Sequence, residues 1–467
     1  MVILGILLYL LITVWIGLKT SSKVKNSTDF LLASKKLGMG LSTAALFATW
    51  FGAETIIGAS SEMADKGIMG IIEDPMGAAL CLLLLGSFFA KPLYRLNLMT
   101  FGDFYAIKYN KSVEFVASLV LTISYLGWIA GQIVAIGVIF HETMGISQIL
   151  GTLLGTSIVL TYTYYGGMWS VATLDALQNT IIIIGLLSIL FFISPELFQK
   201  KTLESLPSNY FQFFPHQDFH SWTNWLSTWF IVGLGSLPGQ DIFQRVMSSK
   251  NEKIAQRSAW LASFLYILIG SFPLIIAVYV KVYQPQFLQE RDSQNMLIKF
   301  VNSEMPAFVQ LLFLGALISA IMSSASGAIM APAAIIAENL YAFFFGKPND
   351  QKLLKISRIS VLMVGLISLL VTFMNNKVFE LVGISAAISG VSLFIPMIYG
   401  LYFKNHSPLG AILSITCGLL VYLILKLNES SYPDMFWGLF ASWIGMIFGN
   451  TINKYFNKKN VIKQLGK

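Results

Sequence analysis

Long apolar runs, separated by short polar segments, cover most of this 467-residue chain. A membrane-spanning helix needs about 20 predominantly apolar residues, so the pattern predicts an all-α polytopic membrane protein. We expect thirteen spans, at 2–18, 41–60, 72–96, 114–140, 146–165, 170–194, 222–244, 256–280, 305–344, 355–374, 378–403, 408–427 and 432–452. The ninth run is too long for one crossing, so part of it should form a helix outside the bilayer core. No polar segment could stand alone as a soluble domain, so 1–467 is expected to be a single transmembrane domain.

Basic residues between the spans set the expected orientation. Cytoplasmic loops of membrane proteins are enriched in lysine and arginine. If the N-terminus is outside and the spans alternate, most of the 31 basic residues fall in inner segments. Lysines follow the first apolar run and none precede it, unlike a signal peptide, so 2–18 should be a retained span. The sequence thus predicts a multi-pass protein of the inner (plasma) membrane with a cytoplasmic C-terminus.

The second span, 41–60, has an unusual middle. Trp50, Gly52, Ala53 and Glu54 lie where hydrocarbon tolerates polar groups least. Non-helical backbone at that depth is tolerated only where it lines a protein-enclosed cavity. Residues 48–54 are therefore expected to break the helix and to form one wall of a solute site. A kinked but continuous helix is the alternative, because glycine is common in membrane helices.

A second interruption lies at the matching place later in the chain. Residues 233–241, GLGSLPGQD, place three glycines and a proline inside the seventh span. The spans within 41–194 and 222–403 can then form two five-helix repeats. Because each repeat has an odd number of helices, the two repeats must have opposite orientations in the membrane. The runs at 2–18 and 408–452 are extra helices. Because paired interrupted helices mark transporter binding sites, this match favours a break at Gly52 over a kink.

Residues 316–328, ALISAIMSSASGA, concentrate four serines in the ninth span. Hydroxyl and carbonyl oxygens suit a hard cation such as Na⁺, whereas serine and alanine also permit close helix packing. Both interpretations stay open on this segment alone. A tight turn at Gly166 and Gly167 should lead into the sixth span. Asp175, about two turns inside that span, is a functional candidate because carboxylates are costly in membranes. A hydrated structural role is its alternative.

Aromatic and polar side chains near the broken segment are candidates for solute binding. Trp50, Tyr125 and Trp128 can present ring faces to an organic cation, and Gln132 lies one turn after Trp128. Packing or interface anchoring is the alternative for any single tryptophan. The predicted solute site consists of Trp50, Glu54, Thr55, Trp128, Gln132 and Gln240, with Glu73 and Asp74 nearby.

Composition narrows the class of protein. The chain is 55% hydrophobic and only 12% charged, against about 25% charged in soluble domains. Its net charge of +8 resides in short loops, which favours a lipid bilayer over nucleic acid as partner. Cys81 and Cys417 are too few for a disulfide framework or metal cluster. Without catalytic motifs or an ATP-binding module, an enzyme is not expected, and uphill transport would need an ion gradient.

Four motifs resemble those of the sodium:solute symporter family, and the likeness covers nearly the whole chain. They are DFLLASKKLG (29–38), GGMWSVATLDALQ (166–178), FQRVMSS (243–249) and ALISAIMSSAS (316–326). The resemblance implies a leucine-transporter-like inverted five-plus-five helix repeat with one extra N-terminal and two extra C-terminal helices. It also implies Na⁺-coupled symport of a small organic solute by alternating access.

The resemblance further implies particular site residues. By motif position, backbone carbonyls and serine hydroxyls of Ala48, Phe51, Ala320, Ser323 and Ser324 would bind sodium. Asp175 matches an acidic residue associated with inward sodium release, although Leu174 replaces the usual threonine before it. Local stretches look most like choline carriers, yet Ala78 and Gly239 replace two aromatic residues of their cage, while Trp50 and Trp128 keep the other two. This departure predicts a different solute with a cationic or polar group.

The sequence leaves three other functions open. These are a transporter-like sensor that binds solute without moving it, a sodium channel, and a proton-coupled symporter with Glu54 as proton carrier. The expected partners are Na⁺, a small organic solute and the bilayer, and the sequence makes no prediction of the oligomeric state.

Overall fold

The computed structural model describes residues 2–197, 205–215, 218–288, 295–373 and 378–465. Throughout these ranges the regular elements are helices, and backbone pairing of the extended type is limited to a bridge between Leu37 and Ser249. The segments 195–221 and 281–304, which follow the sixth and eighth predicted spans as long outer loops, lie partly outside the described residues. The all-α expectation is confirmed.

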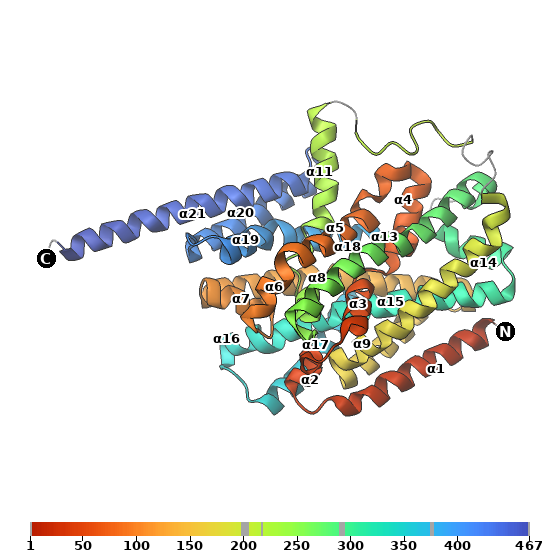
Figure 1. Cartoon of the computed structure of the whole chain (residues 1–467), viewed down its shortest axis with the longest axis horizontal. Coiled ribbons are helices and arrows are strands. Elements are labelled where there is room, and N and C mark those ends of the chain that lie inside the picture. Colours follow the sequence, from red (N-terminus) through yellow and green to blue (C-terminus); the bar gives the residue numbers. More distant parts are fainter. Residues whose placement is uncertain (1, 198–204, 216–217, 289–294, 374–377, 466–467) are drawn as a thin grey trace.

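Most helices follow one another with short connections, whereas a longer segment that includes residues 205–215 separates α9 from α11 (Figure 1). The α-helices are α1 (Val2–Thr20), α2 (Ser27–Leu32), α3 (Met39–Ala48), α4 (Ala59–Lys66), α5 (Ala78–Leu84), α6 (Ala90–Leu96), α7 (Phe101–Lys108), α8 (Lys111–Met144), α9 (Gln148–Leu197), α11 (Phe219–Gly233), α12 (Gln240–Ser248), α13 (Glu252–Tyr283), α14 (Met296–Glu304), α15 (Ala307–Ile335), α16 (Tyr341–Phe345), α17 (Asp350–Val371), α18 (Val378–Ser389), α19 (Ile395–Tyr402), α20 (Pro408–Leu427) and α21 (Asp434–Leu465). Wider π-helical turns occupy Glu54–Gly58, Ile72–Gly77, Leu85–Phe89, Ile336–Leu340 and Gly390–Phe394. Tighter 3₁₀ turns occupy Ser21–Lys23, Ala33–Lys35, Gly67–Ile71 and Pro285–Leu288.

Ten continuous helical stretches among the described residues are long and apolar enough to cross a membrane. Two of them, Glu54–Leu96 and Gln148–Leu197, each contain parts of two predicted spans. The predicted span at 222–244 is divided between α11 and α12, which are both short. The ninth span continues from α15 through a π-helical turn into α16. The count of thirteen crossings therefore stays a prediction.

Both predicted interruptions are present. Helix α3 ends at Ala48, and regular helix resumes only after a non-helical segment at 49–52. Helix α11 ends at Gly233, and α12 begins at Gln240 after a turn that contains Pro238. Each break frees backbone groups inside the bundle, which is tolerated at membrane depth only beside a cavity or protein contacts.

The expected turn between the fifth and sixth spans is a sharp bend within α9. Gly167 has φ 51° and ψ −143°, a conformation that side chains disfavour. A Cβ placed there would lie 2.4 Å from the backbone oxygen of Phe30. Glycine therefore permits both the bend and the close contact with α2.

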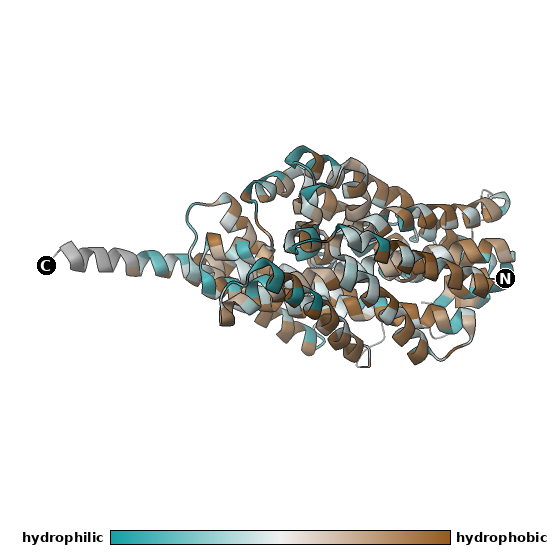
Figure 2. Ribbon diagram, turned by 90° about the horizontal axis from the view of Figure 1, so that it is seen from below, coloured by the Kyte–Doolittle hydropathy of each residue, from teal (hydrophilic) through white to brown (hydrophobic). Residues whose placement is uncertain are grey.

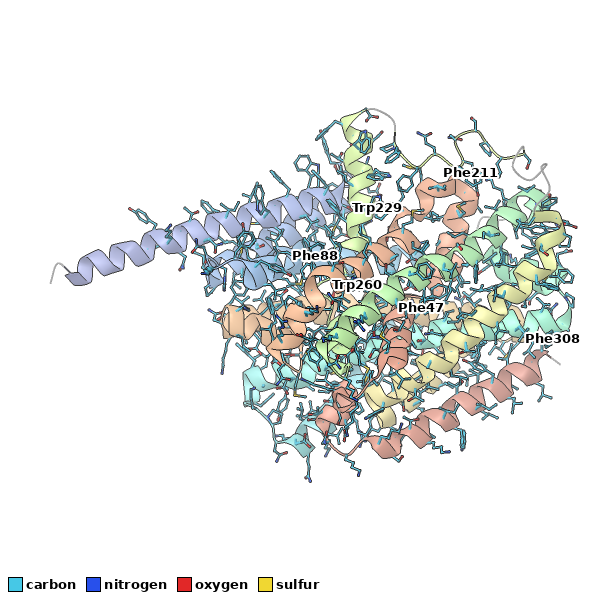
Figure 3. The ribbon with its side chains drawn as sticks, viewed as in Figure 1. Phe47, Phe88, Phe211, Trp229, Trp260 and Phe308 are labelled. Atoms are coloured by element: carbon cyan, nitrogen blue, oxygen red, sulfur yellow. The ribbon has the colours of Figure 1, made fainter. Side chains whose placement is uncertain are left out.

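The bundle buries α12 and most of α3 and exposes apolar side chains elsewhere. Helix α1 runs along one edge beside α9, and α20 and α21 form a pair on the other side (Figure 1). Apolar residues dominate the bundle, whereas the projecting end of α21 is polar before its grey segment (Figure 2). Phe88 and Phe308 are exposed, as suits contact with lipid, while Phe47 is buried (Figure 3). The two free cysteines, Cys81 on α5 and Cys417 on α20, lie within helices.

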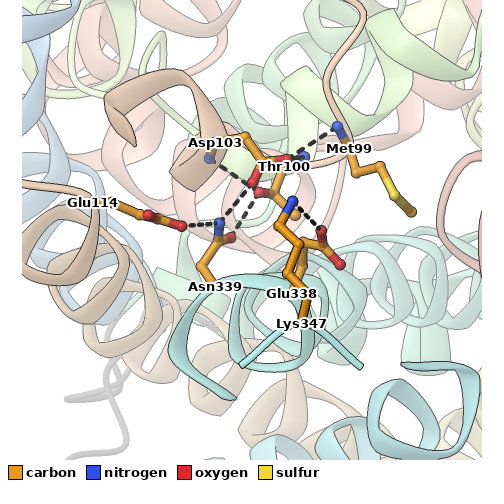
Figure 4. Close-up of polar contacts among 7 residues, drawn as sticks. All are labelled: Met99, Thr100, Asp103, Glu114, Glu338, Asn339 and Lys347. Atoms are coloured by element: carbon orange, nitrogen blue, oxygen red, sulfur yellow. Dashed lines mark hydrogen bonds and ion pairs between the residues drawn. The ribbon is translucent and has the colours of Figure 1, made fainter. Parts of the chain in front are cut away.

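A polar network joins α7, α8 and the π-helical turn Ile336–Leu340 that follows α15 (Figure 4). The Asn339 side chain, 2% exposed, accepts a hydrogen bond from the Thr100 hydroxyl at 2.7 Å. Its amide nitrogen donates to Asp103 and Glu114, both at 2.9 Å. Lys347 lies 3.9 Å from Glu338 in the same region. One amide thus links the N-cap and a carboxylate of α7 to a carboxylate of α8.

Candidate functional site

A cavity lies between the two broken helices, α8 and α18. The broken segment after α3 contributes Trp50 and Glu54, and the π-helical turn at Ile72–Gly77 contributes Glu73 and Asp74. The remaining wall consists of Ser124, Tyr125 and Trp128 from α8, Val232, Ser236, Gly239 and Asp241 from the α11–α12 region, and Phe379, Val382, Ser385, Ala386 and Ser389 from α18. The cavity combines aromatic faces with four carboxylates.

Glu54 is held by donors from α8. The indole N–H of Trp128 donates to Oε1 at 3.2 Å, and Nε2 of Gln132 donates to Oε2 at 2.6 Å. The Gln132 amide is oriented by the backbone N–H of Ala53, which donates to its oxygen at 3.2 Å. Because both Glu54 oxygens accept hydrogen bonds, this arrangement suits the ionised carboxylate, which has acceptors only. The break in the helix thus frees the Ala53 N–H to order the side chains that hold Glu54.

Asp74 is held by a chain of hydroxyl groups. The Tyr266 hydroxyl donates to Oδ1 of Asp74 at 3.0 Å and lies 2.7 Å from the Thr55 hydroxyl. Thr55 also lies 3.2 Å from the backbone oxygen of Trp50. Thr55 therefore bonds to Trp50 of the cavity wall and to Tyr266, but it does not itself line the cavity. Oδ2 of Asp74 is buried without a hydrogen-bond partner.

Asp241 occupies the first turn of α12 and faces α8. Its backbone N–H donates to the Tyr125 hydroxyl at 3.0 Å, and that hydroxyl hydrogen bonds to the Asp241 carboxylate. Arg245, one turn later, is fully buried. Its Nε donates to the backbone oxygen of Ala45 at 2.8 Å, and Nη1 lies 3.3 Å from the backbone oxygen of Asp241. Arg245 therefore links α12 to α3.

Gly52 lies where an added side chain would meet three oxygens. A Cβ at this position would lie 2.7 Å from Oγ of Ser324 and 2.8 Å from both Oε1 of Gln132 and Oε2 of Glu54. The backbone N–H of Gly52 donates to the oxygen of Trp50 at 2.8 Å, which tightens the break. Glycine here lets residues of the serine-rich helix and α8 approach the same point.

An oxygen-rich region lies beside this break. The Ser324 hydroxyl donates to the backbone oxygen of Ala48 at 3.3 Å, and the Ser323 hydroxyl donates to Asp175. Ala320 lies one turn before Ser324 on α15, and Phe51 lies within the break; all these residues are buried. Oδ2 of Asp175 is buried without a partner. Carbonyl, hydroxyl and carboxylate oxygens are ligands for a hard cation, so the donor set fits Na⁺.

Gln240 occupies a different place from the other predicted solute-binding residues. Its amide oxygen accepts a hydrogen bond from the backbone N–H of Phe101 at 2.6 Å, and it does not line the cavity. The adjacent Asp241 lines the cavity, although sequence reasoning did not select it. Tyr266 and the α18 residues Phe379 and Ser385 were also not anticipated. No polar break marks α18, so its part in the wall became evident only from packing.

The fold and the site define a class of membrane protein. Two interrupted helices flank a polar cavity inside an all-helical bundle, as in secondary transporters, and a group of oxygen atoms of the kind that suits a hard cation adjoins the first break. The chain belongs to the sodium:solute symporter family, whose profile matches residues 30–418. It is therefore a sodium-coupled symporter and not an enzyme, and Na⁺ is its coupling ion.

Individual relatives extend over most of the chain. A high-affinity choline transporter of Drosophila melanogaster is 25% identical over 87% of this chain and 67% of its own length. The human high affinity choline transporter 1 is 25% identical over 93% of this chain and 79% of its own length. Sodium/proline symporter 2 of Staphylococcus saprophyticus is 24% identical, covering 90% of this chain and 84% of that protein.

Solved structures support the fold. A substrate-bound outward-open Na⁺-coupled sialic acid symporter superimposes with a TM-score of 0.82 at 16% identity, covering 97% of this chain and 96% of that one. Mhp1, a nucleobase-cation-symport-1 family transporter in a closed conformation, gives a TM-score of 0.62 at 13% identity, covering 92% and 95%. The predicted leucine-transporter-like fold is confirmed.

Proposed function

We propose that this symporter imports a small organic solute with a positively charged group, driven by Na⁺, across the plasma membrane. The single observation that supports this most is the position of Glu54. Its carboxylate faces the cavity between aromatic rings and accepts hydrogen bonds from Trp128 and Gln132. Choline and proline, named for the relatives, each carry a positively charged nitrogen.

In this proposal Trp50, Glu54, Trp128 and Gln132 form the solute site. Thr55 positions Asp74 through Tyr266, and Gln240 acts indirectly by fixing α12 against α7. Aromatic faces attract a cation through the ring quadrupole, and the carboxylate supplies charge. A charged group inside the bilayer is either paired with an opposite charge or located in a water-filled cavity. Here the positively charged solute pairs with the Glu54 carboxylate.

The sodium site would consist of Ala48, Phe51, Ala320, Ser323 and Ser324, with Asp175 accepting the ion on its way inward. The support is the contact between the Ser324 hydroxyl and the backbone oxygen of Ala48. Na⁺ bound there would hold the end of α3 against α15. Because residues 49–53 connect this end directly to Glu54, ordering the ion site also orders the solute site.

Transport would proceed by alternating access. Na⁺ and solute bind near the middle of the bundle, and the broken helices then move against α8 and α15, as in other transporters with interrupted helices. The orientation proposed from the basic residues puts the N-terminus outside and the C-terminus in the cytoplasm. Each cycle releases both ligands on the cytoplasmic side.

Electrogenic transport by the purified protein in liposomes tests the proposal. Choline, betaine, proline, basic amino acids, sugars and short carboxylates are added in turn with Na⁺ outside, and again with K⁺ replacing Na⁺. A current and solute uptake that require Na⁺ support it. Sodium flux without solute would indicate a channel, binding without uptake would indicate a sensor, and uptake driven equally by a proton gradient without Na⁺ would indicate proton coupling through Glu54.

A further inference from the structure

The cavity carries far more negative than positive charge. Four carboxylates, those of Glu54, Glu73, Asp74 and Asp241, line it from three separate segments. Among the described residues of its wall there is no lysine, arginine or histidine. Buried ionised carboxylates are costly unless paired, so these groups, when ionised, require positive charge from elsewhere.

Nearby groups of the protein supply only part of that charge. Arg245 contacts the backbone of Asp241 and offsets one carboxylate. Lys426 and Asp434 both act on Glu73 electrostatically, with opposite signs. Na⁺ bound beside Ala48 would offset a second negative charge close to Glu54. With all four wall carboxylates ionised, at least two negative charges are then left for the solute to balance.

Two carboxylate oxygens in the wall also lack hydrogen-bond donors. Asp74 and Asp241 are 3% and 2% exposed, and Oδ2 of each is buried without a partner. The other oxygen of each already accepts a tyrosine hydroxyl. An unsatisfied buried acceptor destabilises the site until a donor reaches it. An ammonium group with N–H bonds can donate to these oxygens, whereas a quaternary nitrogen has no hydrogen to donate.

The carboxylates do not converge on one point. In the described part of the chain, no three His, Cys, Asp or Glu side chains are placed to hold a metal ion. Trp50, Trp128 and Phe379 lie among the acidic groups in the wall. Aromatic faces suit methylene groups and neighbouring cationic charge. The arrangement fits separate positive centres joined by an apolar chain better than a single small ion.

From these observations we infer that the solute is an organic dication whose two charged nitrogens carry N–H groups, as in an α,ω-diamine. The inference rests on the proposed function, because Na⁺ is assigned part of the charge balance. It names a class of solute that is more specific than a singly charged amine and that differs from a quaternary ammonium ion.

Binding of putrescine to the purified protein tests the inference without requiring transport. Thermal stability is measured in detergent against rising putrescine, with NaCl or with KCl of equal ionic strength. Butylamine is the matched monocation, and the fully N-methylated form of putrescine is the matched dication without N–H groups. Cadaverine and longer diamines extend the series. We expect putrescine or a longer diamine to bind in Na⁺ at least about ten-fold more tightly than either matched compound.

A neutralising substitution locates the second charge. Asp74→Asn keeps the shape of the side chain and an oxygen acceptor for the Tyr266 hydroxyl but removes one charge. We expect it to weaken diamine binding about ten-fold and to change butylamine binding much less. Glu304→Gln, an exposed position at the end of α14, should change neither. Stabilisation of Asp74→Asn by Na⁺ alone shows that the variant is folded.

Uptake in liposomes separates failure of the inference from failure of the proposed function. Sodium-dependent uptake of a monocation, zwitterion or neutral solute, with no diamine binding, would overturn the inference and leave symport intact. Diamine binding without sodium-dependent uptake of any solute would keep the inferred ligand class and contradict the proposed transport. Equal binding of putrescine and butylamine would also overturn the inference, since it would mean that a second positive charge on the solute does not increase its affinity.

Discussion

Tyr125 and Asp241 share two hydrogen bonds across the cavity wall. The Asp241 backbone N–H donates to the tyrosine hydroxyl at 3.0 Å, and this hydroxyl hydrogen bonds to the Asp241 side chain. Tyr125 lies on α8 and Asp241 lies in the first turn of α12, so one hydroxyl group satisfies a free N–H at the start of α12 and orients a carboxylate. The first turn of a helix has N–H groups without intrahelical partners, which explains why this contact is stabilising.

Replacing Tyr125 with phenylalanine removes both hydrogen bonds and keeps the ring. We expect solute affinity to fall about ten-fold, because the Asp241 carboxylate loses its orientation and a buried N–H is left unpaired. The half-saturating solute concentration for Na⁺-dependent current measures this. Tyr399→Phe, which keeps the ring that stacks on Phe403, is the control and should leave the current unchanged. Equal effects of the two substitutions would contradict a specific role for the Tyr125 hydroxyl.

Ser324→Ala should impair sodium binding. The substitution removes one oxygen beside the Ala48 carbonyl, so the Na⁺ concentration needed for half-maximal uptake should rise about ten-fold. Uptake at several Na⁺ concentrations measures the change. Ser326→Ala removes a hydroxyl from the same helix that bonds to the helix's own Ser323 carbonyl and should have much less effect. Unchanged Na⁺ dependence in Ser324→Ala would show that the proposed ion site is wrong.

Gly52→Ala should abolish transport while leaving the bundle folded. The new methyl group would lie within 2.8 Å of oxygens on Ser324, Gln132 and Glu54, so the break must shift away from both the ion and the solute. Gly40→Ala is the control, since no atom lies within 4 Å of a Cβ there. Uptake and gel-filtration profiles of the two variants give the comparison. Normal transport by Gly52→Ala would mean that the backbone around residue 52 can accommodate the methyl group without disturbing the ion and solute sites.

Asn339→Ala should destabilise the fold more than it affects ligand affinity. Thr100, Asp103 and Glu114 lose a shared partner (Figure 4), which should cost about 2–4 kcal/mol. The melting temperature in detergent should fall by several degrees, while the affinity for Na⁺ changes little. Asn428→Ala removes an amide that bonds within its own helix at an exposed end and should melt normally. An unchanged melting temperature in Asn339→Ala would exclude a structural role for the network.

The sequence was most informative where polar or flexible residues stand in apolar runs. The breaks at 48–54 and 233–241 and the bend at Gly167 were all predictable, because such residues are costly in hydrocarbon unless they serve a cavity or turn. The neighbours Gln240 and Asp241 show what was not predictable. Successive helical residues point in directions about 100° apart, so the rotation of α12 decides that Asp241 lines the cavity while Gln240 contacts Phe101.

Cavity-lining residues that belong to no motif and no polar break could not be predicted from the sequence. Phe379 and Ser385 line the cavity only because α18 packs across α8. Glu73 and Asp74 were expected near the solute site at the start of the third span, but only the π-helical turn at Ile72–Gly77 shows that both line the cavity. Such tertiary placement depends on how elements distant in sequence pack together, which local composition does not encode.

The scarcity of thiols makes this protein convenient for distance measurements. The chain has two cysteines, buried Cys81 on α5 and Cys417 on α20. Replacing both with alanine or serine would give a thiol-free background, into which pairs of cysteines could be introduced for spin labelling. Labels at exposed positions of α11 and α18, which both contribute to the cavity wall, would report how these two helices move as Na⁺ and solute are added. The moving parts of the cycle could then be followed in lipid, one helix pair at a time.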